Sequence, residues 1–585
     1  MMESNAADTT RGIRYEPDEQ PPHALALGLG FQYAMLAVAG IVVTPAIVVR
    51  AAGAGEDYLT WAAFAALAIS GVTTVFQALR VGQIGSGYIL MMGTSGAFIA
   101  VCVTALAEGG PGMLASLVAA SALVQFALSV RLALLRRLFT PTVCGTVIML
   151  IAVTVMPIVF DMLTQVPEGA SPAAAPVSAA VTIVVTVAVT LRAAGVWRLW
   201  APVIGIVSGC VVGAAYGIYD TRLIAEAGWI GLPAGDWPGL DLSFGVTFWS
   251  LLPAFVFVTL IGAIETIGDS VAIQRVSWRK PRAVDFRAVQ GAVAADGLGN
   301  LLSGLAATVP NTTYSSSIAV AEITGVTSRL VGVYIGAVFV GLAFLPKFMG
   351  LILAIPGPVV WGYTVVLLSV LFVLGMKVVV QDGIDYRKGV VAGVAFWVGT
   401  GFQQQWIFPE ALGPWWGGLL GNGMTAGGLA AILMTAFLEL AQPRPRRIRT
   451  DLNVDAYPKI DEFLAEFSAR HGWSEAMADR VRAVGEETLL TLTNPAGEGA
   501  TPDGRHLLLT ARRDGLAAEL EFVAATDDSN IEDQLALLGD RSGDAPGDRE
   551  VSLRLLRHFA SSVRHQQYHD TDVVTVRVEP TAAAS

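Results

Sequence analysis

Residues Asp296–Arg329 read DGLGNLLSGLAATVPNTTYSSSIAVAEITGVTSR and interrupt an otherwise apolar chain. The stretch carries Pro310, a run of Asn, Thr and Ser side chains, and two carboxylates, Asp296 and Glu322. Non-helical backbone at membrane depth is tolerated only where protein or a watery cavity satisfies its polar groups. A lipid-facing helix is therefore excluded, and we predict that this stretch forms part of a substrate site.

The composition is that of a membrane protein. Of 585 residues, 54% are hydrophobic and 15% are charged, and the mean hydropathy is +0.59. Apolar runs of about 20 residues recur, which is the length that a helix needs to cross the hydrocarbon core. A soluble chain of this length would be more polar and divided into several domains. Cys102, Cys144 and Cys210 all lie in apolar segments, so we expect neither disulfides nor a metal site.

Fourteen apolar segments follow a polar amino-terminal tail, residues 1–23, that shows no signal peptide. They run at 24–49, 58–79, 84–107, 112–130, 138–163, 172–191, 199–218, 247–273, 289–306, 310–326, 328–346, 350–376, 389–403 and 416–441. Lys and Arg gather in alternate loops, so the positive-inside rule predicts a multi-pass inner-membrane protein with both termini in the cytoplasm. The predicted inside residues are Arg80, Arg131, Arg136, Arg137, Arg192, Arg198, Arg275, Arg279, Lys280, Arg282, Arg287, Arg329, Lys377, Arg387, Lys388 and Arg444–Arg449.

Fourteen segments divide into two sets of seven, and the third and tenth then correspond. The third contains GSGYILMMGTSGAFIA and the tenth contains AATVPNTTYSSSIAVA, each an extended run followed by small hydroxyl residues and a short apolar piece. Paired interrupted segments at equivalent positions indicate a transporter site built from inverted repeats. The alternative is two irregular helices that carry small residues for packing.

Such a pair has a defined chemistry. Two short extended runs can hydrogen-bond to each other at the bilayer midplane, and each following half-helix then begins there with free amides and a positive dipole end. Ser and Thr are natural N-caps at such positions. Polar, planar or anionic solutes suit this environment.

Carboxylates lie within two other segments. Glu265 and Asp269 are four residues apart and share one helical face. An ionisable group inside a span marks an ion or substrate path, and burial disfavours its charged form, which suits proton exchange. The alternative for Glu265 and Asp269 is a carboxylate held for packing alone. Asp296 is expected either to relay a proton or to hold the tenth segment, and Glu322 to cap or pair locally.

At these residues a family becomes recognisable. The membrane region, residues 24–441, resembles the nucleobase–ascorbate transporters, also called the nucleobase:cation symporter-2 or xanthine/uracil permease family. The matching pieces are GTSGAFIA (93–100), ETIGDS (265–270), DGLGNLLSGL (296–305), TTYSSSIAVAEITGVTSR (312–329) and IPGPVVWG (355–362). The resemblance implies seven plus seven inverted helices, antiparallel strands in segments three and ten, core and gate domains, and often a homodimer.

The resemblance also implies roles for individual residues. Glu265 matches the carboxylate that hydrogen-bonds the base, and Asp269 and Asp296 join it as candidates for proton coupling. The substrate-binding candidates are Glu265, Gly96, Ala97, Tyr314, Ser315, Ser316 and Ser317.

The sequence departs from the family pattern at several of these positions. Ser316 and Ser317 stand where many members have Glu or Gln followed by Asn, Gly96 where an aromatic often packs, and Gln32–Tyr33 where many have Gln–His. Serine reaches less far and offers fewer hydrogen bonds, and Gly96 opens space or leaves a stacking partner missing. We therefore expect a larger or more polar base, such as a xanthine- or urate-like purine, to be favoured over uracil.

The tail has a different composition. Lys and Arg number 24 against 23 Asp and Glu up to residue 450, but 13 against 25 beyond it. After a basic linker, 442–450, able to meet anionic headgroups, we predict a cytosolic α/β domain, 451–585, with helices at 457–470, 474–492 and 550–564 and strands at 505–511, 516–524 and 571–579.

The tail's order of elements looks like the histidine-kinase-type ATPase fold of anti-sigma-factor kinases. Glu487 stands at the general-base place, but Thr491 replaces the metal-holding Asn, Ala525–Asp528 lacks Asp-x-Gly, and the Gly-rich lid before Leu553 is missing. We therefore predict a non-catalytic regulatory domain that docks a cytosolic protein; an unrelated small α/β domain is the alternative.

The sequence thus predicts a secondary-active importer of a xanthine- or urate-like purine, or uracil, driven by protons or sodium. One alternative is an anion transporter or channel of the sulfate-permease type, and another is a nucleobase sensor that signals through the tail. We expect no enzyme activity, since no nucleophile–base constellation or nucleotide-binding loop is present. Neither a cofactor nor a nucleic-acid partner is expected.

Overall fold

The computed structural model describes residues 12–130, 140–233, 235–280, 282–380, 386–408, 410, 416–417, 420–440, 445–493, 506–524, 548–568 and 572–580. The chain forms two compact units, one of residues 1–280 with 288–436 and the other of residues 281–287 with 437–585. Of the sequence predictions, those on Arg131, Arg136, Arg137, Arg444 and Ala525–Asp528 lie outside the described residues.

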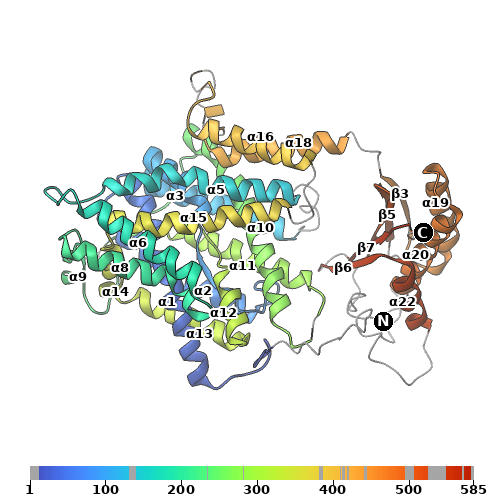
Figure 1. The fold of residues 1–585 in the computed structure, drawn as a ribbon, viewed down its shortest axis with the longest axis horizontal. Coiled ribbons are helices and arrows are strands. Elements are labelled where there is room, and N and C mark those ends of the chain that lie inside the picture. Colours follow the sequence, from blue (N-terminus) through green and yellow to red (C-terminus); the bar gives the residue numbers. More distant parts are fainter. Residues whose placement is uncertain are drawn as a thin grey trace. The chain divides into compact units, whose positions relative to one another are not determined.

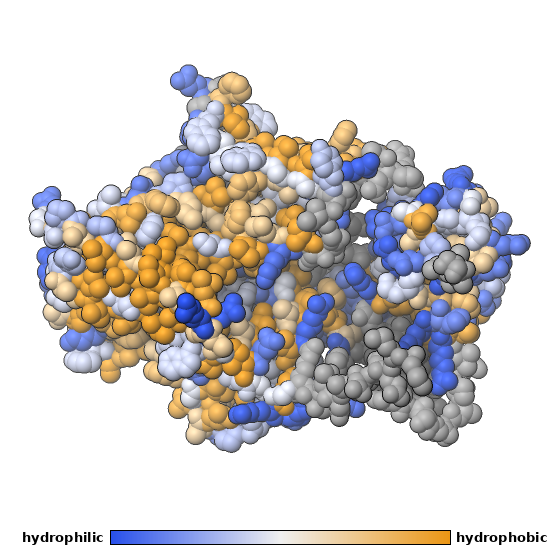
Figure 2. Space-filling model, viewed as in Figure 1, coloured by the Kyte–Doolittle hydropathy of each residue, from blue (hydrophilic) through white to orange (hydrophobic). Residues whose placement is uncertain are grey.

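The first unit is a bundle of apolar helices (Figure 1). In the described residues, seven helices are long and apolar enough to cross a membrane, or eight if α13 and α14, bent by 86°, form one span. Figure 2 shows apolar side chains over much of the visible face of this unit. Its elements are α1 (His23–Ala51), α2 (Glu56–Leu79), β1 (Met92–Thr94), η1 (Gly96–Phe98), α3 (Ile99–Val130), α5 (Pro141–Asp161), η2 (Met162–Thr164), α6 (Ala174–Arg192), α7 (Val196–Leu199), α8 (Ala201–Ala215), α9 (Arg222–Ala225), α10 (Val246–Val276), α11 (Phe286–Leu305), β2 (Asn311–Thr313), α12 (Ser316–Thr324), α13 (Arg329–Ala343), α14 (Pro346–Leu353), α15 (Gly357–Val380), α16 (Tyr386–Gln403) and α18 (Gly423–Leu440).

Each predicted apolar segment coincides with a helix or with part of one. The segments at 84–107 and 112–130 join in α3, which is broken at Gly110 (φ 73°, ψ −175°) ahead of Pro111. The segment at 350–376 is instead two helices, α14 and α15, because Pro356 follows the end of α14. The segment at 310–326 is broken as predicted, into strand β2 and the nine-residue helix α12.

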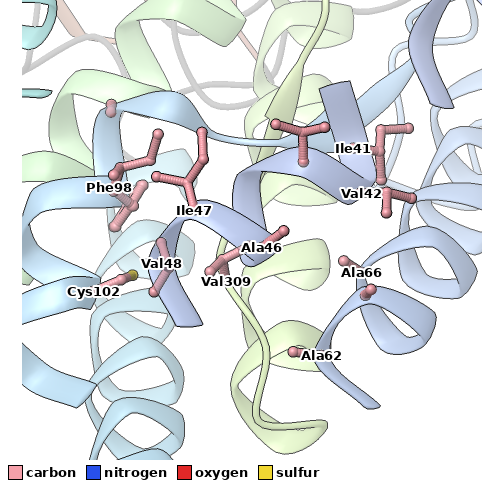
Figure 3. Packing of buried hydrophobic residues seen from close by; sticks show 14 of the residues in the cluster. Ile41, Val42, Ala46, Ile47, Val48, Ala62, Ala66, Phe98, Cys102 and Val309 are labelled. Carbon is pink, nitrogen blue, oxygen red and sulfur yellow. The ribbon is translucent and has the colours of Figure 1, made fainter. Parts of the chain in front are cut away.

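The centre of this unit is built around α1. Figure 3 shows Ile47 and Val48 of α1 beside Phe98 and Cys102, with Val309, which precedes β2, on the other side of α1. Because lipid tails are as apolar as these side chains, close packing rather than water exclusion holds such helices together. α1 therefore packs against the segment that follows β1 and the segment that precedes β2.

The amino-terminal residues Arg14–Glu19, which we call the strap, bind the polar ends of three helices. The backbone amides of Arg14 and Tyr15 donate to Gly325 O after α12, at 2.7 and 3.2 Å. Two arginines complete the contact, since Arg279 pairs with Glu19 at 2.6 Å and Arg329 with Asp18 at 3.0 Å. The strap thus joins the end of α10, the end of α12 and the start of α13.

The second unit is an antiparallel sheet covered on one face by helices (Figure 1). The strand order is β3-β4-β5-β7-β6. Alternate residues such as Leu509, Phe522 and Val576 point to one core with Leu464 and Val481 of the helices. The elements are β3 (Arg446–Asp451), η4 (Val454–Ala456), α19 (Tyr457–Arg470), α20 (Glu475–Thr493), β4 (His506–Asp514), β5 (Ala517–Ala524), α22 (Asp548–Phe559), β6 (Ser562–Gln567) and β7 (Asp572–Val578).

Two parts of the tail differ from the sequence prediction. The predicted helix through residue 564 is wrong, because α22 ends at Phe559 and Ser562–Gln567 pairs with β7, placing Val563 opposite Val576. Residues Arg446–Asp451 of the predicted linker region form the edge strand β3, in which Ile448 packs on the core and Arg446 pairs with Glu466 at 2.8 Å. Exposure alternates along this strand, with Arg447 and Arg449 exposed and Ile448 and Thr450 on the inner face.

Candidate functional site

The two short strands meet inside the first unit and satisfy each other's backbone. β1 and β2 pair antiparallel with Gly93 opposite Thr312. The ladder continues at both ends, where Tyr314 N donates to Met91 O and Ser95 N to Pro310 O, each at 2.8 Å. The predicted pairing of segments three and ten is confirmed. Because Thr94 lies opposite Asn311 and Met92 opposite Thr313, η1 and α12 start at opposite ends of the strand pair.

Each strand is held at its first residue by a side chain of a neighbouring helix. Met92 N donates to Thr74 Oγ1 of α2 at 2.9 Å. Asn311 N donates to Asn300 Oδ1 of α11 at 2.7 Å. Both acceptors are buried, at 0% and 3% exposure. The positions of β1 and β2 are therefore set by polar contacts, which are strong in a low-dielectric interior.

Tyr314 braces the strand pair. Its ring lies against Gly93, where a Cβ atom would collide with Tyr314 Cζ. Its hydroxyl donates to Thr94 O at 3.0 Å. Tyr314, a predicted substrate-binding residue, is thus turned back onto β1.

Asp269 of α10 is bound to the junction of β2 and α12. Its carboxylate accepts from Thr313 Oγ1 at 2.8 Å and from Ser315 Oγ at 2.7 Å. Asp269 is 7% exposed. Ser315 stands at the N-cap position of α12, but its side chain does not cap the helix because it is engaged by Asp269. The expectation of serine capping is wrong here.

Glu265 lies one turn before Asp269 on the same face of α10. Gly262, three residues earlier, faces Phe98 of η1, since a Cβ atom there would lie 3.9 Å from Phe98 Cε2. Glu265 therefore lies between the part of α10 that faces η1 and the part that binds Ser315. It is partly exposed, and its carboxylate has no hydrogen-bond partner among the described residues.

Open space lies beside Gly96 of η1, and α10 packs against both η1 and α12. A Cβ atom on Gly96 would meet no atom within 4 Å, and Ser315 and Ser316 are exposed. Within the described part of the chain, the amides of Gly96, Ala97 and Ser316 have no acceptor, so two helix starts present donors near Glu265. We call this region, bordered by Gly96, Glu265, Ser315 and Ser316, the midplane site.

The other two predicted substrate residues line it less directly. Ala97 is 4% exposed and can contribute its amide. Ser317 is fully buried, and its hydroxyl donates to Tyr314 O at 2.8 Å. That hydroxyl therefore stabilises the first turn of α12.

Asp296 lies behind the midplane site. It is fully buried, and its Oδ2 accepts from Gln125 Nε2 at 2.7 Å and Thr266 Oγ1 at 3.0 Å. Its Oδ1 has no partner in the described structure. Sequence reasoning missed Gln125, Thr266, Thr74 and Asn300; a lone amide inside an apolar run, as at Gln125, is the signal that would have found one of them.

In the described residues, a bundle of apolar helices holds two helix starts and, on α10, a partly exposed carboxylate without a hydrogen-bond partner. This combination is typical of a membrane transport protein. The sequence model of the xanthine/uracil permeases, a family described as "Permease family", matches residues 25–406 of this chain. The chain belongs to this family.

Several curated proteins are similar to the chain. The xanthine permease XanP of Escherichia coli (strain K12) is 28% identical over 443 residues, covering 72% of this chain and 93% of its own. The uric acid permease PucK of Bacillus subtilis (strain 168) is 26% identical over 435 residues, covering 72% of this chain and 97% of its own.

Two solved structures are also similar. The transmembrane domain of the cyanobacterial bicarbonate transporter BicA has a TM-score of 0.44 and 16% identity, covering 72% of this chain and 99% of that one. The murine anion transporter Slc26a9 in the inward-facing state has a TM-score of 0.48 and 13% identity, covering 74% and 72%.

Proposed function

We propose that this protein is a secondary-active transporter that imports a xanthine- or urate-like purine across the inner membrane. The observation that carries the proposal is the Glu265 carboxylate. It is partly exposed on α10, which packs against η1 and α12, and among the described residues it has no hydrogen-bond partner. The relatives named for xanthine and uric acid support the substrate class.

The midplane site matches the edge of an oxidised purine. Such a base presents ring N–H donors beside carbonyl acceptors. Glu265 accepts from an N–H, while the amides of Gly96 and Ser316 and the Ser316 hydroxyl donate to carbonyl oxygens. Uracil carries a similar edge, but the space beside Gly96 leaves room for a second ring. An anion such as sulfate would be repelled by a charged Glu265.

The packing supports two inverted repeats of seven segments, and so fourteen in all. Segments five and twelve correspond in such a fold, and their helices approach closely where Gly145 of α5 and Gly375 of α15 each face the other's carbonyl. Segments two and nine also correspond, and each supplies the acceptor for the first amide of a strand, Thr74 for β1 and Asn300 for β2.

Alternating access follows from how the helices group. One set, α1, α2, α3, α10, α12 and α13, packs mainly within itself and carries both strands, and α11 joins it through Asn300. The other set, α5, α6, α8, α15 and α16, also packs mainly within itself. α18 joins this set where Gly423 lies against Gly399 O of α16. We assign the first as the core domain and the second as the gate, with the midplane site exposed to each side in turn as one moves against the other.

Protons are the proposed coupling ion. Glu265 has no fixed partner, so it can take up a proton and change from acceptor to donor as the base binds or leaves. Asp269 and Asp296 are fixed by two donors each, and they stay candidates for relaying that proton. Sodium is the alternative, which uptake under separately imposed proton and sodium gradients distinguishes.

The strap supports a cytoplasmic amino terminus. Arg279 and Arg329, which the charge pattern assigns to the inside, bind Glu19 and Asp18. The amino-terminal segment is therefore at the same end of the unit as the basic loops.

The tail is proposed to be a non-catalytic domain that docks a cytosolic regulatory protein. Thr491, at the position where the ATPase resemblance would need a metal-holding Asn, donates to Glu487 O of its own helix at 2.6 Å. It is 1% exposed, so it is not available to a metal. Uptake by a chain lacking 451–585 separates a transporter from a sensor that acts through the tail. The homodimer expected from the resemblance stays a prediction.

A thermal-shift screen of the purified protein tests the substrate class. Xanthine, urate, hypoxanthine, uracil, ascorbate and sulfate are compared on the wild type, Glu265→Gln and Glu322→Gln. Glu322 is an exposed carboxylate of α12 and serves as the matched control. We expect xanthine or urate to stabilise the wild type and Glu322→Gln but not Glu265→Gln. Stabilisation by sulfate alone would instead support the anion transporter.

A further inference from the structure

Gln125 is a buried amide in the apolar run LVQFAL of α3. Its side chain is fully buried, and both ends of the amide are used. Nε2 donates to Asp296 Oδ2 at 2.7 Å, and Oε1 accepts from Asn300 Nδ2 at 2.7 Å. Burying an amide in a membrane span is costly unless it is paired. The two hydrogen bonds of Gln125 offset that cost.

The Asn300 bond leads to the backbone of β2. Because Gln125 takes the amino group of Asn300, the other end of that amide, Oδ1, is turned toward Asn311 N, to which it is bonded at 2.7 Å. At β1 the equivalent bond comes from Thr74 directly, and the Thr74 hydroxyl is itself held by Ser70 O at 2.6 Å. β2 therefore depends on a residue of a third helix.

The Asp296 bond leads toward the midplane site. Asp296 Oδ2 also accepts from Thr266, which belongs to α10 and adjoins Glu265 in sequence. At its far end β2 places Thr313 on Asp269. Gln125 thus contacts both supports of the site wall, the carboxylate behind α10 and the amide that holds β2.

We propose that Gln125 is a positioning residue for transport, which keeps Asp296 as a hydrogen-bond acceptor and orients Asn300 to hold β2. The inference rests on the proposed function for its transport readout, but its structural readout does not need the substrate. The orientation requires a donor and an acceptor on one side chain, which the Gln125 amide supplies at every pH.

The titratable groups near Gln125 come from two elements. Asp296 faces it directly from α11, and Glu265 and Asp269 of α10 lie beyond Thr266. β2 and the described part of α3 after Glu108 carry no charged side chain. Replacing the amide by a carboxylate therefore puts two acidic groups in contact, and one shared proton restores the bond, since two adjoining carboxylates do not both ionise readily.

The test compares three variants in the full-length protein. Gln125→Met matches the length without hydrogen bonds, Gln125→Glu matches the shape, and the swap Gln125→Glu/Asp296→Asn keeps the contact with donor and acceptor exchanged. The thermal midpoint in detergent and the uptake of xanthine by proteoliposomes are measured from pH 5 to pH 8.

For Gln125→Glu we expect a thermal midpoint close to wild type at pH 5 that falls as pH rises. Its uptake, divided by that of wild type at the same pH, should be at least tenfold lower at pH 8 than at pH 5. For Gln125→Met we expect uptake at least tenfold below wild type at every pH. The swap Gln125→Glu/Asp296→Asn, which restores one donor facing one acceptor, should recover the thermal midpoint at pH 8.

A space-filling role for Gln125 predicts different results. Wild-type uptake by Gln125→Met, or a thermal midpoint of Gln125→Glu that follows the wild type at every pH, would overturn the proposal. If no variant or wild type takes up xanthine, the substrate assignment fails while the thermal data still decide the role of Gln125. Should Gln125→Glu not fold at any pH, the swap decides: a folded swap supports the proposal and an unfolded one refutes it.

Discussion

A methyl group added at Gly93 tests how the strand pair is held. In the structure the Tyr314 ring lies where a Cβ atom on Gly93 would be, and the Tyr314 hydroxyl donates to Thr94 O at 3.0 Å. Gly93→Ala must therefore push the ring away and break that hydrogen bond. Gly96 is three residues further on, and a Cβ atom there meets nothing within 4 Å, so Gly96→Ala is the matched control.

The cost can be estimated from these contacts. Overpacking a tight interior costs about 1–3 kcal/mol, and the lost hydroxyl bond adds about 1 kcal/mol. Gly93→Ala should therefore destabilise the protein by about 2–4 kcal/mol, whereas Gly96→Ala should stay within about 0.5 kcal/mol. Gly96→Ala should instead raise the KM for xanthine, because its methyl group enters the midplane site.

Thermal unfolding in detergent, followed by intrinsic fluorescence, measures the difference. The double variant Gly93→Ala/Tyr314→Leu should recover part of the loss, because the two residues are in contact and their effects are not additive. Equal midpoints for Gly93→Ala and Gly96→Ala would refute the assignment of Tyr314 as a brace.

Three further predictions concern other contacts. Asp269→Asn should lower kcat/KM for uptake at least about tenfold without loss of folding, because a hydrogen bond to a charged group contributes about 1.5–3 kcal/mol; uptake assays check this. Arg279→Ala should speed proteolysis of the strap, whereas Arg275→Ala should not. The hydrogen bond from Arg279 lowers the pKa of Glu19 below its ordinary value of 4.5. In the wild type, Glu19 should therefore stay ionised and paired with Arg279 until the pH falls below about 4.5. In the tail, burial raises the pKa of Glu487, so ionising it costs stability as pH rises above about 4.5; Glu487→Gln should slow hydrogen exchange of the tail at pH 8 and not at pH 4.

The sequence was sufficient to predict the broken segment on which the proposed site is built. Pro310 and the hydroxyl residues after it cannot form a lipid-facing helix, so the sequence alone predicts that this segment is broken. The register of the two strands could not be predicted from the sequence, because it depends on the packing of the Tyr314 ring on Gly93. That contact joins segments far apart in the chain and leaves no local pattern.

The contacts behind the site were also beyond local reasoning. Gln125 and Asp296 are separated by 171 residues, and their bond is visible only once α3 and α11 pack together. In the tail, Ser562–Gln567 continues a helical run in composition, yet pairing with β7 makes it a strand. Tertiary pairing overrides weak local preference in such segments.

Proton-driven uptake by Glu265→Gln tests whether the Glu265 carboxylate couples purine import to protons. Proteoliposomes containing wild type, Glu265→Gln or the control Glu322→Gln receive labelled xanthine under an imposed inward proton gradient. We predict accumulation by wild type and Glu322→Gln that a protonophore abolishes, and none by Glu265→Gln, although that variant folds with a normal thermal midpoint. Accumulation by Glu265→Gln at the wild-type rate, still abolished by the protonophore, would contradict the account.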